Sequence, residues 1–246
     1  MEFYESISNS YDFIFPPNPA QVNFILKFSE NNATDIKVLD VGCATGSLAL
    51  ALAEKNISVS AFDYDAEMVK LARAKKQELE LIEFPVFEQL NMKEIDRHYQ
   101  VKSFSHVACF GNTLVHLQSE ADVYTFLKAA HTILRENGKI MIQILNYDYI
   151  LSEKIQSLPL IENEHVRFER NYEFPVNSKL INFKTILTEK TTEKMVSNTV
   201  QLNPLRKNDL EKLLQRAGFR NFKFFGSFKA EELQYNSIPL IVVAQT

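Results

Sequence analysis

The sequence contains little cysteine and no pattern of ligands that would hold a metal ion. Cys43 and Cys109 are the only cysteines among 246 residues, and both lie in apolar stretches. No Cys-x-x-Cys pair is present, and the five histidines lack metal-ligand spacing. We therefore expect neither a disulfide framework nor a zinc site, and no metal. This use of cysteine is typical of a reducing compartment, so a cytoplasmic location is expected.

The chain also lacks a long hydrophobic run, a leader pattern and a strong charge of one sign. No apolar run has the length needed to cross a bilayer, and residues 1–13 show no basic start followed by an apolar stretch. A membrane partner and a signal peptide are therefore not expected. The net charge is −4 without long runs of one sign, whereas nucleic-acid binding favours a basic face. No nucleic-acid partner is expected either.

What the sequence does contain is an alternation of strand-like and helix-like segments. Apolar content is 46%, enough for the core of one α/β domain with a modest insertion. Apolar runs separated by helical patterns predict a parallel sheet covered on both faces. Asn137 and Gly138 are expected to end the helix before the fifth strand. The predicted strands are 36–41, 57–63, 84–88, 103–110, 139–145, 219–228 and 238–244, and the predicted helices are 19–31, 47–55, 65–76, 119–135, 149–156 and 206–217.

The helical rhythm is interrupted after Asn146. Three runs there alternate in period two and predict an antiparallel sheet inserted into the α/β core: 166–174, 180–187 and 194–202. The aromatic-rich first residues either cover an edge of the core or form a flap over the active site. The predicted domains are an N-terminal helical cap (1–35), a core domain (36–146 and 204–246) and an inserted β-sheet lid over the substrate (147–203).

The turn after the first predicted strand combines features of a nucleoside-binding site. A buried strand with Asp40 near its end leads through Gly42 and Gly46 into a helix that opens near Ser47. Such a turn lets a ligand lie against bare backbone, and the free N–H groups favour a carboxylate-bearing ligand. Asp63 ends the next apolar run, where an acid usually accepts hydrogen bonds from a ribose. A nucleoside cofactor with a charged tail is therefore predicted.

The spacing of the glycines separates two classes of cofactor. A dinucleotide site has the pattern Gly-x-Gly-x-x-Gly, but the segment 42–46 lacks the third glycine that this pattern needs. The segment instead resembles motif I of class I S-adenosylmethionine (SAM) dependent methyltransferases, usually Asp-x-Gly-x-Gly-x-Gly. Asp40, Gly42 and Gly46 match that motif, and Ala44 replaces its middle glycine. An oxidoreductase of the NAD type is therefore disfavoured.

Two further segments resemble one branch of this family, the glycine/sarcosine N-methyltransferases. The branch carries Gly-Asn-Ser/Thr-x-x-His-Leu after the fourth strand and Asn-Tyr-Asp after the fifth. The chain has CFGNTLVHLQ at 109–118 and NYDYIL at 146–151. The resemblance covers most of the chain from Val38 to Gly218. It implies a Rossmann-like seven-stranded methyltransferase sheet whose last strand lies antiparallel beside the fifth, with SAM as the cofactor, but it does not identify the acceptor.

The resemblance also implies which residues surround the cofactor. The glycine turn would border the methionine part, and Asp63 would hold the ribose. Asn91 stands where the family usually has an aspartate at the adenine edge, and Met68 fits either an adenine contact or the core. Tyr11 would reach the cofactor's carboxylate. The predicted cofactor-binding residues are Tyr11, Asp40, Gly42, Cys43, Ala44, Gly46, Asp63, Tyr64, Met68, Asn91, Met92, Phe110 and Gly111.

Residues that follow the fourth and fifth strands are expected to contact the acceptor. Asn112 would point its amide into the crevice at the strand ends. His116 fits either a general base or a packing residue, and the turn that starts at Asn146 could simply end its strand. Two arginines of the insertion would either bind a carboxylate or be solvated. The predicted catalytic residues are Asn112, His116 and Tyr147, and the predicted substrate-binding residues are Asn112, Asn146, Arg167 and Arg170.

These features predict a SAM-dependent methyltransferase that acts on a small molecule, with an amine as the preferred acceptor. Transfer from a sulfonium needs mainly proximity and alignment from the protein. An O-methyltransferase and a non-catalytic SAM-binding regulatory module remain as alternatives. We expect a small-molecule acceptor as the partner, and a monomer or a weak homo-oligomer.

Overall fold

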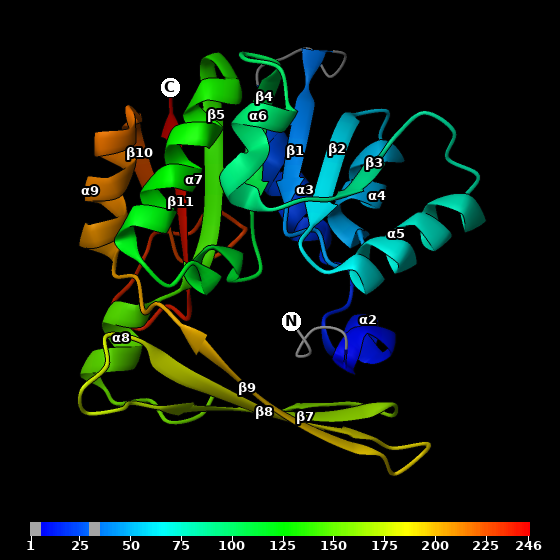
Figure 1. Ribbon diagram of the computed structural model, residues 1–246, viewed down its shortest axis with the longest axis vertical. Helices are drawn as coiled ribbons and strands as arrows, with labels where there is room; N and C mark the ends of the chain where they lie inside the picture. Colours follow the sequence, from blue (N-terminus) through cyan, green and yellow to red (C-terminus); the bar gives the residue numbers. More distant parts are fainter. Residues whose placement is uncertain (1–5, 30–34) are drawn as a thin grey trace.

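The computed structural model describes residues 6–29 and 35–246, which form two β-sheets (Figure 1). The large sheet has seven strands in the order β10-β11-β5-β4-β1-β2-β3. Its strands are β1 (Lys37–Val41), β2 (Ser58–Asp63), β3 (Val86–Gln89), β4 (Phe104–Cys109), β5 (Leu134–Leu145), β10 (Arg220–Phe225) and β11 (Pro239–Gln245). The small sheet is made of β6 (Ile161–Glu162), β7 (Val166–Glu173), β8 (Ile181–Glu189) and β9 (Met195–Leu202).

Strand direction confirms the predicted fold class. Strands β1 to β5 pair in parallel, whereas β11 lies antiparallel between β5 and β10. The three period-two runs of the insertion form the antiparallel strands β7, β8 and β9, to which the short β6 is added. The division of the chain into three domains stays a prediction, and residues 1–5 and 30–34 of the predicted cap lie outside the described residues.

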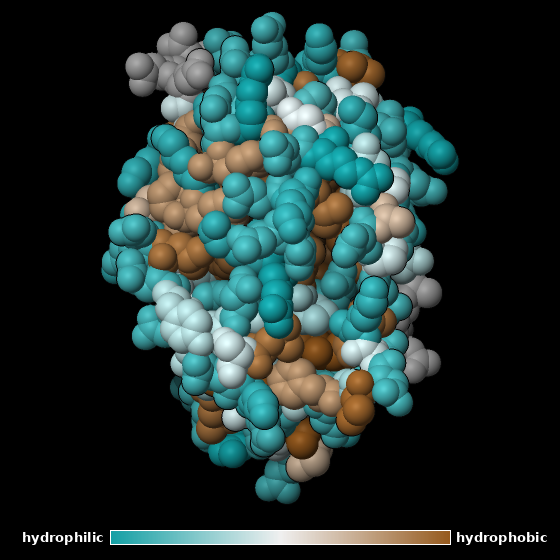
Figure 2. All heavy atoms as spheres, turned by 90° about the vertical axis from the view of Figure 1, so that its left-hand side faces the viewer, coloured by the Kyte–Doolittle hydropathy of each residue, from teal (hydrophilic) through white to brown (hydrophobic). Residues whose placement is uncertain are grey.

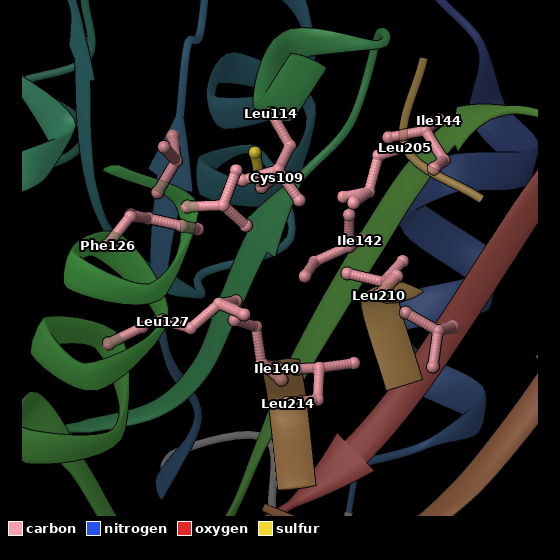
Figure 3. Packing of buried hydrophobic residues seen from close by; sticks show 14 of the residues in the cluster. Cys109, Leu114, Phe126, Leu127, Ile140, Ile142, Ile144, Leu205, Leu210 and Leu214 are labelled. Carbon is pink, nitrogen blue, oxygen red and sulfur yellow. The ribbon is translucent and has the colours of Figure 1, made fainter. Parts of the chain in front are cut away.

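Helices cover both faces of the large sheet. On one face they are η3 (Met92–Glu94), α6 (Ile95–His98), η4 (Thr113–His116), α7 (Glu120–Ile133) and α9 (Lys207–Ala217), and on the other α3 (Pro19–Lys27), α4 (Ser47–Ala53) and α5 (Ala66–Glu78). Alternate residues of each strand enter the two cores: Leu39 and Val41 pack on the first face, and Val38 on the second. Figure 3 shows the first core, where side chains of α7 and α9 meet Ile140 and Ile142 of β5.

The remaining short helices lie near the small sheet. They are η1 (Ser8–Ser10), α2 (Tyr11–Ile14) and α8 (Tyr147–Ser152). Ile7 and Ile14 pack against Val166, Phe168 and Leu187 of β7 and β8, so the N-terminal segment and the small sheet share a third apolar core.

The predicted end of the helix before β5 is wrong. Helix α7 ends at Ile133 rather than at Asn137 and Gly138, which lie inside β5. The register between β4 and β5 shifts between Phe104 and His106, and Asn137 has a φ of +61° in the shifted part. Asn137 and Gly138 therefore shape a bulge in the strand, a conformation that glycine and asparagine tolerate, instead of ending the helix.

The surface carries mixed side chains. Within the described residues no helix is both long enough and apolar enough to cross a membrane. The face seen in Figure 2 is mostly hydrophilic, and its hydrophobic residues gather in patches that include the level of α8 and the small sheet.

The loop glycines allow a stability test. A Cβ on Gly46 would lie 2.6 Å from Phe87 and 3.0 Å from Ala72, whereas a Cβ on Gly111 would meet only Thr113, at 3.9 Å. Both glycines have positive φ, so Gly→Ala costs about 1–2 kcal/mol at either. We expect Gly46→Ala to lose a further ~1–3 kcal/mol by overpacking. Chemical denaturation of the two variants measures the difference, and equal losses would contradict the packing argument.

Candidate active site

The loop after β1 passes through three residues with positive φ. They are Gly42 at +71°, Ala44 at +48° and Gly46 at +84°. The backbone N–H groups of Gly42 and Cys43 donate to the carbonyl oxygen of Phe62, at 2.9 and 3.0 Å. Ala44 therefore adopts a conformation that normally favours glycine, at a cost of about 1–2 kcal/mol. The loop keeps the shape that the glycine motif requires although its middle glycine is absent.

Asp63, the last residue of β2, fixes this loop. Its Oδ2 accepts a hydrogen bond from the backbone N–H of Ala44 at 2.9 Å, and its Oδ1 accepts one from Asp65 at 3.0 Å. Burial raises the pKa of the Asp63 carboxyl, and these N–H groups oppose the rise. Each carboxylate oxygen keeps lone-pair capacity for a further donor. Asp63 can therefore hold the loop and a ligand hydroxyl together.

Asp40 lies one strand away in the middle of the sheet. Its side chain is 3% exposed, and Oδ2 is buried with no hydrogen-bond partner among the described residues. Burial, assisted by the charge of Asp63, raises the pKa of Asp40 to about 7. A buried carboxylate oxygen without a donor is costly. The site therefore favours a ligand that brings a cation or a donor to Asp40.

Two cavities meet at the glycine loop. The smaller has a volume of about 440 Å³ and the larger one of about 550 Å³. Five predicted residues line both of them: Tyr11, Gly42, Ala44, Gly111 and His116. A ligand that lies over this loop can therefore reach into both cavities.

The smaller cavity gathers the residues predicted around ribose and adenine. Asp63, Tyr64, Met68, Asn91 and Met92 all line it. Met68 is 1% exposed, so it belongs to the buried interior and to the cavity wall at once. The side chain of Asn91 accepts from the N–H of Lys93 at 3.0 Å and caps η3, which leaves its amide hydrogens for other partners.

The segment after β4 forms the wall between the cavities. Gly111 donates its N–H to Oε1 of Gln143 at 2.8 Å. Asn112 accepts from the N–H of Leu145 at 3.0 Å and donates to the hydroxyl of Tyr147 at 3.1 Å. The Asn112 amide is therefore held at the wall of the larger cavity, which Asp40, Cys43 and Phe110 also line.

His116 lines both cavities, as Tyr11 does. Burial lowers the pKa of its imidazole to about 4. The ring is therefore neutral near pH 7 and has a nitrogen that can accept a proton.

The small sheet closes the larger cavity. Phe168, Arg170, Phe183 and Leu202 of β7, β8 and β9 line it, together with Leu158. Of this group only Arg170 is charged. Its Nη2 donates to the carbonyl of residue 159 at 2.7 Å, and its Nε is buried with no partner among the described residues. We refer to this small sheet as the lid, and to the face of it that lines the cavity as its inner face.

The N-terminal segment lies between the glycine loop and the lid (Figure 1). Tyr11 lines both cavities, and burial raises the pKa of its hydroxyl. Asp12 accepts a hydrogen bond from the hydroxyl of Thr45 at 2.6 Å and forms an ion pair with Lys75. On the other side, the Ser10 hydroxyl donates to Glu189 of β8 at 2.9 Å. The segment therefore connects the glycine loop to the small sheet, and Tyr11 lies where the two cavities meet.

Two predicted residues face away from the cavities. Gly46 lines neither cavity, because its Cα faces Phe87 of the neighbouring strand. Arg167 also lines neither cavity. It lies on the outer face of β7, where it forms ion pairs with Glu162 and Glu169 at 3.2 and 3.1 Å. These two residues contribute to packing and to the surface.

Two further predicted residues, Asn146 and Tyr147, lie outside the cavities, next to the wall that Asn112 forms. Asn146 lines neither cavity, because its side chain caps α8 by accepting from Tyr149 and donates to the carbonyl of Tyr235. The cap starts α8 at Tyr147, two residues earlier than predicted. Tyr147 is fully buried and lines neither cavity, and its hydroxyl accepts a hydrogen bond from Asn112 in the cavity wall. Both are positioning residues in this structure.

Gln143 and the apolar residues of the lid are not among the predicted site residues. Gln143 is the one polar residue in the run IMIQIL, a signal that was available, and its Oε1 orients Gly111. Phe168, Phe183 and Leu202 follow the period-two pattern, but that pattern alone does not say which face of the lid covers a cavity.

Comparison with known proteins agrees with this geometry. A family model described as a methyltransferase domain matches residues 32–218. A glycine/sarcosine N-methyltransferase from Aphanothece halophytica is 27% identical over 212 residues, which is 84% of this chain and 74% of that enzyme.

Solved structures share the fold at low identity. A SAM-dependent methyltransferase from Clostridium acetobutylicum has a TM-score of 0.81 at 18% identity, over 98% of both chains. A SAM-bound amino pentose methyltransferase from Micromonospora echinaspora has a TM-score of 0.66 at 14% identity, over 100% of this chain and 98% of that one.

The methyltransferase family model matches most of the chain, and the solved structures have the same fold. The resemblance found in the glycine motif is thereby confirmed, with SAM as the cofactor. The chain belongs to the methyltransferase domain family and is an enzyme of the class I SAM-dependent methyltransferases.

Proposed function

We propose that the enzyme transfers the methyl group of SAM to the nitrogen of a small amine bound in the larger cavity. The observation that carries this proposal is the cavity itself, which extends from the glycine loop to the lid. Among the described residues that line it, only Asp40 and Arg170 have acidic or strongly basic side chains. The relative from Aphanothece halophytica is named for N-methylation of glycine and sarcosine, which also supports an amine acceptor.

The residues fit the cofactor. The smaller cavity has room for a nucleoside, and Asp63 in its wall can accept hydrogen bonds from the ribose hydroxyls. The unpartnered oxygen of Asp40 suits the ammonium group of the methionine part. Gly111 lines both cavities and leaves open space where a Cβ would stand, so backbone can approach the ligand there. Tyr11 would then cover the place where the two cavities meet.

The protein's contribution to transfer is alignment and control of the acceptor's protonation state. When bound, SAM supplies a methyl group made electrophilic by the positive sulfur. The amine must be neutral to offer its lone pair, and apolar walls together with the positive Arg170 disfavour the ammonium form. The nitrogen then forms the new bond to the methyl carbon, and the electron pair of the broken bond stays on sulfur. The fixed amide of Asn112 can orient the amine.

Arg170 can bind an acidic group on the acceptor. Arg170 lines the cavity, its Nε has no partner among the described residues, and burial lowers the pKa of its guanidinium. A carboxylate would satisfy this donor with a charge-assisted hydrogen bond. We therefore assign the acceptor's carboxylate to Arg170 and no substrate role to Arg167.

His116 supports a second candidate function, O-methylation of a small hydroxyl compound. A hydroxyl must lose its proton during transfer, so it needs a general base, and His116 lines both cavities in its neutral form, which can accept a proton. An amine that arrives neutral needs no such base.

A direct assay distinguishes these functions. The protein is incubated with labelled SAM and matched pairs of small amines and their hydroxyl analogues, and products are identified by mass spectrometry. We expect methyl groups on nitrogen only. Transfer to oxygen, or no transfer by protein that binds SAM, would contradict the proposed N-methylation.

The ribose assignment predicts a loss of affinity in Asp63→Ala. The variant removes the acceptor of the Ala44 N–H and of the ribose hydroxyls, so the calorimetric Kd for SAM should rise by about 10- to 100-fold. Asp96→Ala is the control, because Asp96 is exposed and lines neither cavity. An unchanged Kd in Asp63→Ala would remove the assignment.

His116→Ala separates the two candidate reactions. N-methylation should keep its kcat within a few-fold, whereas an O-methylation that uses His116 as base should fall by about 10²-fold or more. Because the pKa of His116 is about 4, its protonation should leave no inflection in the rate between pH 6 and 8. A hundredfold loss of N-methylation in the variant would show that the imidazole is required for that reaction too.

A further inference from the structure

The inner face of the lid is arranged in rows that run across its strands. Arg170 of β7 is directly opposite Thr185 of β8, and Thr185 is directly opposite Asn198 of β9. Directly opposite residues of antiparallel strands share a face, so these three form one polar row. Phe168, which lines the larger cavity as Arg170 does, precedes Arg170 by two residues and identifies this face as the inner one.

Apolar rows flank the polar row on both sides. On one side Phe168, Leu187 and Val196 are in register, and on the other Tyr172, Phe183 and Val200. Each flanking row contributes one phenylalanine to the wall of the larger cavity, Phe168 from one and Phe183 from the other. The next row contributes Leu202, and Leu158 lines the same wall. The guanidinium of Arg170 therefore emerges between two hydrophobic walls.

The polar row has donors that the protein leaves without partners. Nε of Arg170 and the hydroxyl oxygen of Thr185 are both buried, and neither has a hydrogen-bond partner among the described residues. Buried donors of this kind are costly unless a ligand satisfies them. Arg170 lines the larger cavity and Thr185 does not, so an anionic group of the acceptor would satisfy the donor of Arg170 and would fix the acceptor's orientation between the walls.

The apolar walls of the larger cavity add a second requirement that the acceptor must meet. The larger cavity has a volume of about 550 Å³, within the range of roughly 300–1,000 Å³ that is typical of pockets for drug-sized ligands. The side of this cavity next to the glycine loop would hold the methionine part of the cofactor. The side next to the lid is lined by phenylalanine and leucine side chains. An acceptor without a side chain would leave these apolar surfaces in contact with water.

We propose that the acceptor is an amino acid with a bulky apolar side chain, whose carboxylate meets Arg170 and whose side chain packs between Phe168 and Phe183. This inference rests on the proposed N-methylation and narrows it. It separates this enzyme from relatives named for glycine and sarcosine, because the lid then selects the acceptor by its side chain. Phe183 and Leu202 become residues that determine specificity.

Steady-state kinetics with matched acceptors test the proposal. L-phenylalanine and L-leucine are compared with glycine and sarcosine, which lack the side chain, and with phenethylamine, which lacks the carboxylate. We expect kcat/KM for the better of the two apolar amino acids to exceed that for glycine by at least about tenfold, as hydrophobic pockets discriminate by that order. Phenylalanine should exceed phenethylamine by a similar factor.

Two pairs of variants assign these preferences to the lid. Phe183→Ala should reduce the phenylalanine-to-glycine ratio of kcat/KM at least about fivefold. Phe174→Ala should leave this ratio unchanged, because Phe174 directly follows β7 and lines neither cavity. Arg170→Gln should remove the preference for phenylalanine over phenethylamine. Arg167→Gln, on the outer face of the same strand, should not. Thermal melting and binding of S-adenosylhomocysteine confirm that each variant is folded, and Phe183→Leu replaces Phe183→Ala if the latter is not.

The outcomes separate this inference from the proposed function. N-methylation of glycine with a kcat/KM equal to or above that of the apolar amino acids would overturn the inference and leave the function intact. If no amine is methylated, calorimetry measures the binding of phenylalanine and of glycine to protein that is saturated with S-adenosylhomocysteine. Tighter binding of phenylalanine than of glycine would support the lid's selectivity and contradict N-methylation, and equal or absent binding would overturn both.

Discussion

The site depends on one hydrogen bond, from the backbone N–H of Ala44 to the carboxylate of Asp63. It joins the loop after β1 to the end of β2, and its length is 2.9 Å. Because Ala44 has a φ of +48°, this contact also stabilises a conformation that an alanine would not adopt unaided. The two cavities meet at this loop. One carboxylate thus shapes the floor of the site and is available to the ligand that lies on it.

The two ends of the larger cavity are built by different parts of the chain. Its floor comes from the parallel sheet, where strand ends and the glycine loop define a place for the cofactor. Its roof comes from the antiparallel lid and from the N-terminal segment, which the hydrogen bonds of Ser10 and Asp12 connect to the lid and to the floor. The part of the site that holds the cofactor and the part that holds the acceptor are therefore separate, so the roof can change while the floor is kept.

The floor could be predicted from the sequence, and most of the roof could not. Asp40, Gly42 and Asp63 are local signals at the ends of apolar runs, and the structure brings all three to the cavities. Gly46, Asn146 and Tyr147 match the same motifs but act by packing, capping and positioning, since a motif does not say which way a side chain points. The role of Phe183 depends on pairing between strands that are distant in the sequence. The sequence at Asn137 and Gly138 resembles a helix end for a similar reason. The bulge there depends on the register between β4 and β5, which the local sequence does not reveal.

The central claim is that the nucleoside lies in the smaller cavity with its ribose at Asp63, and a crystal structure of the complex with S-adenosylhomocysteine tests it most directly. We predict both ribose hydroxyls within hydrogen-bond distance of the Asp63 carboxylate and the amino group of the tail at Asp40. A nucleoside bound elsewhere, or a ribose that turns away from Asp63, would contradict the account.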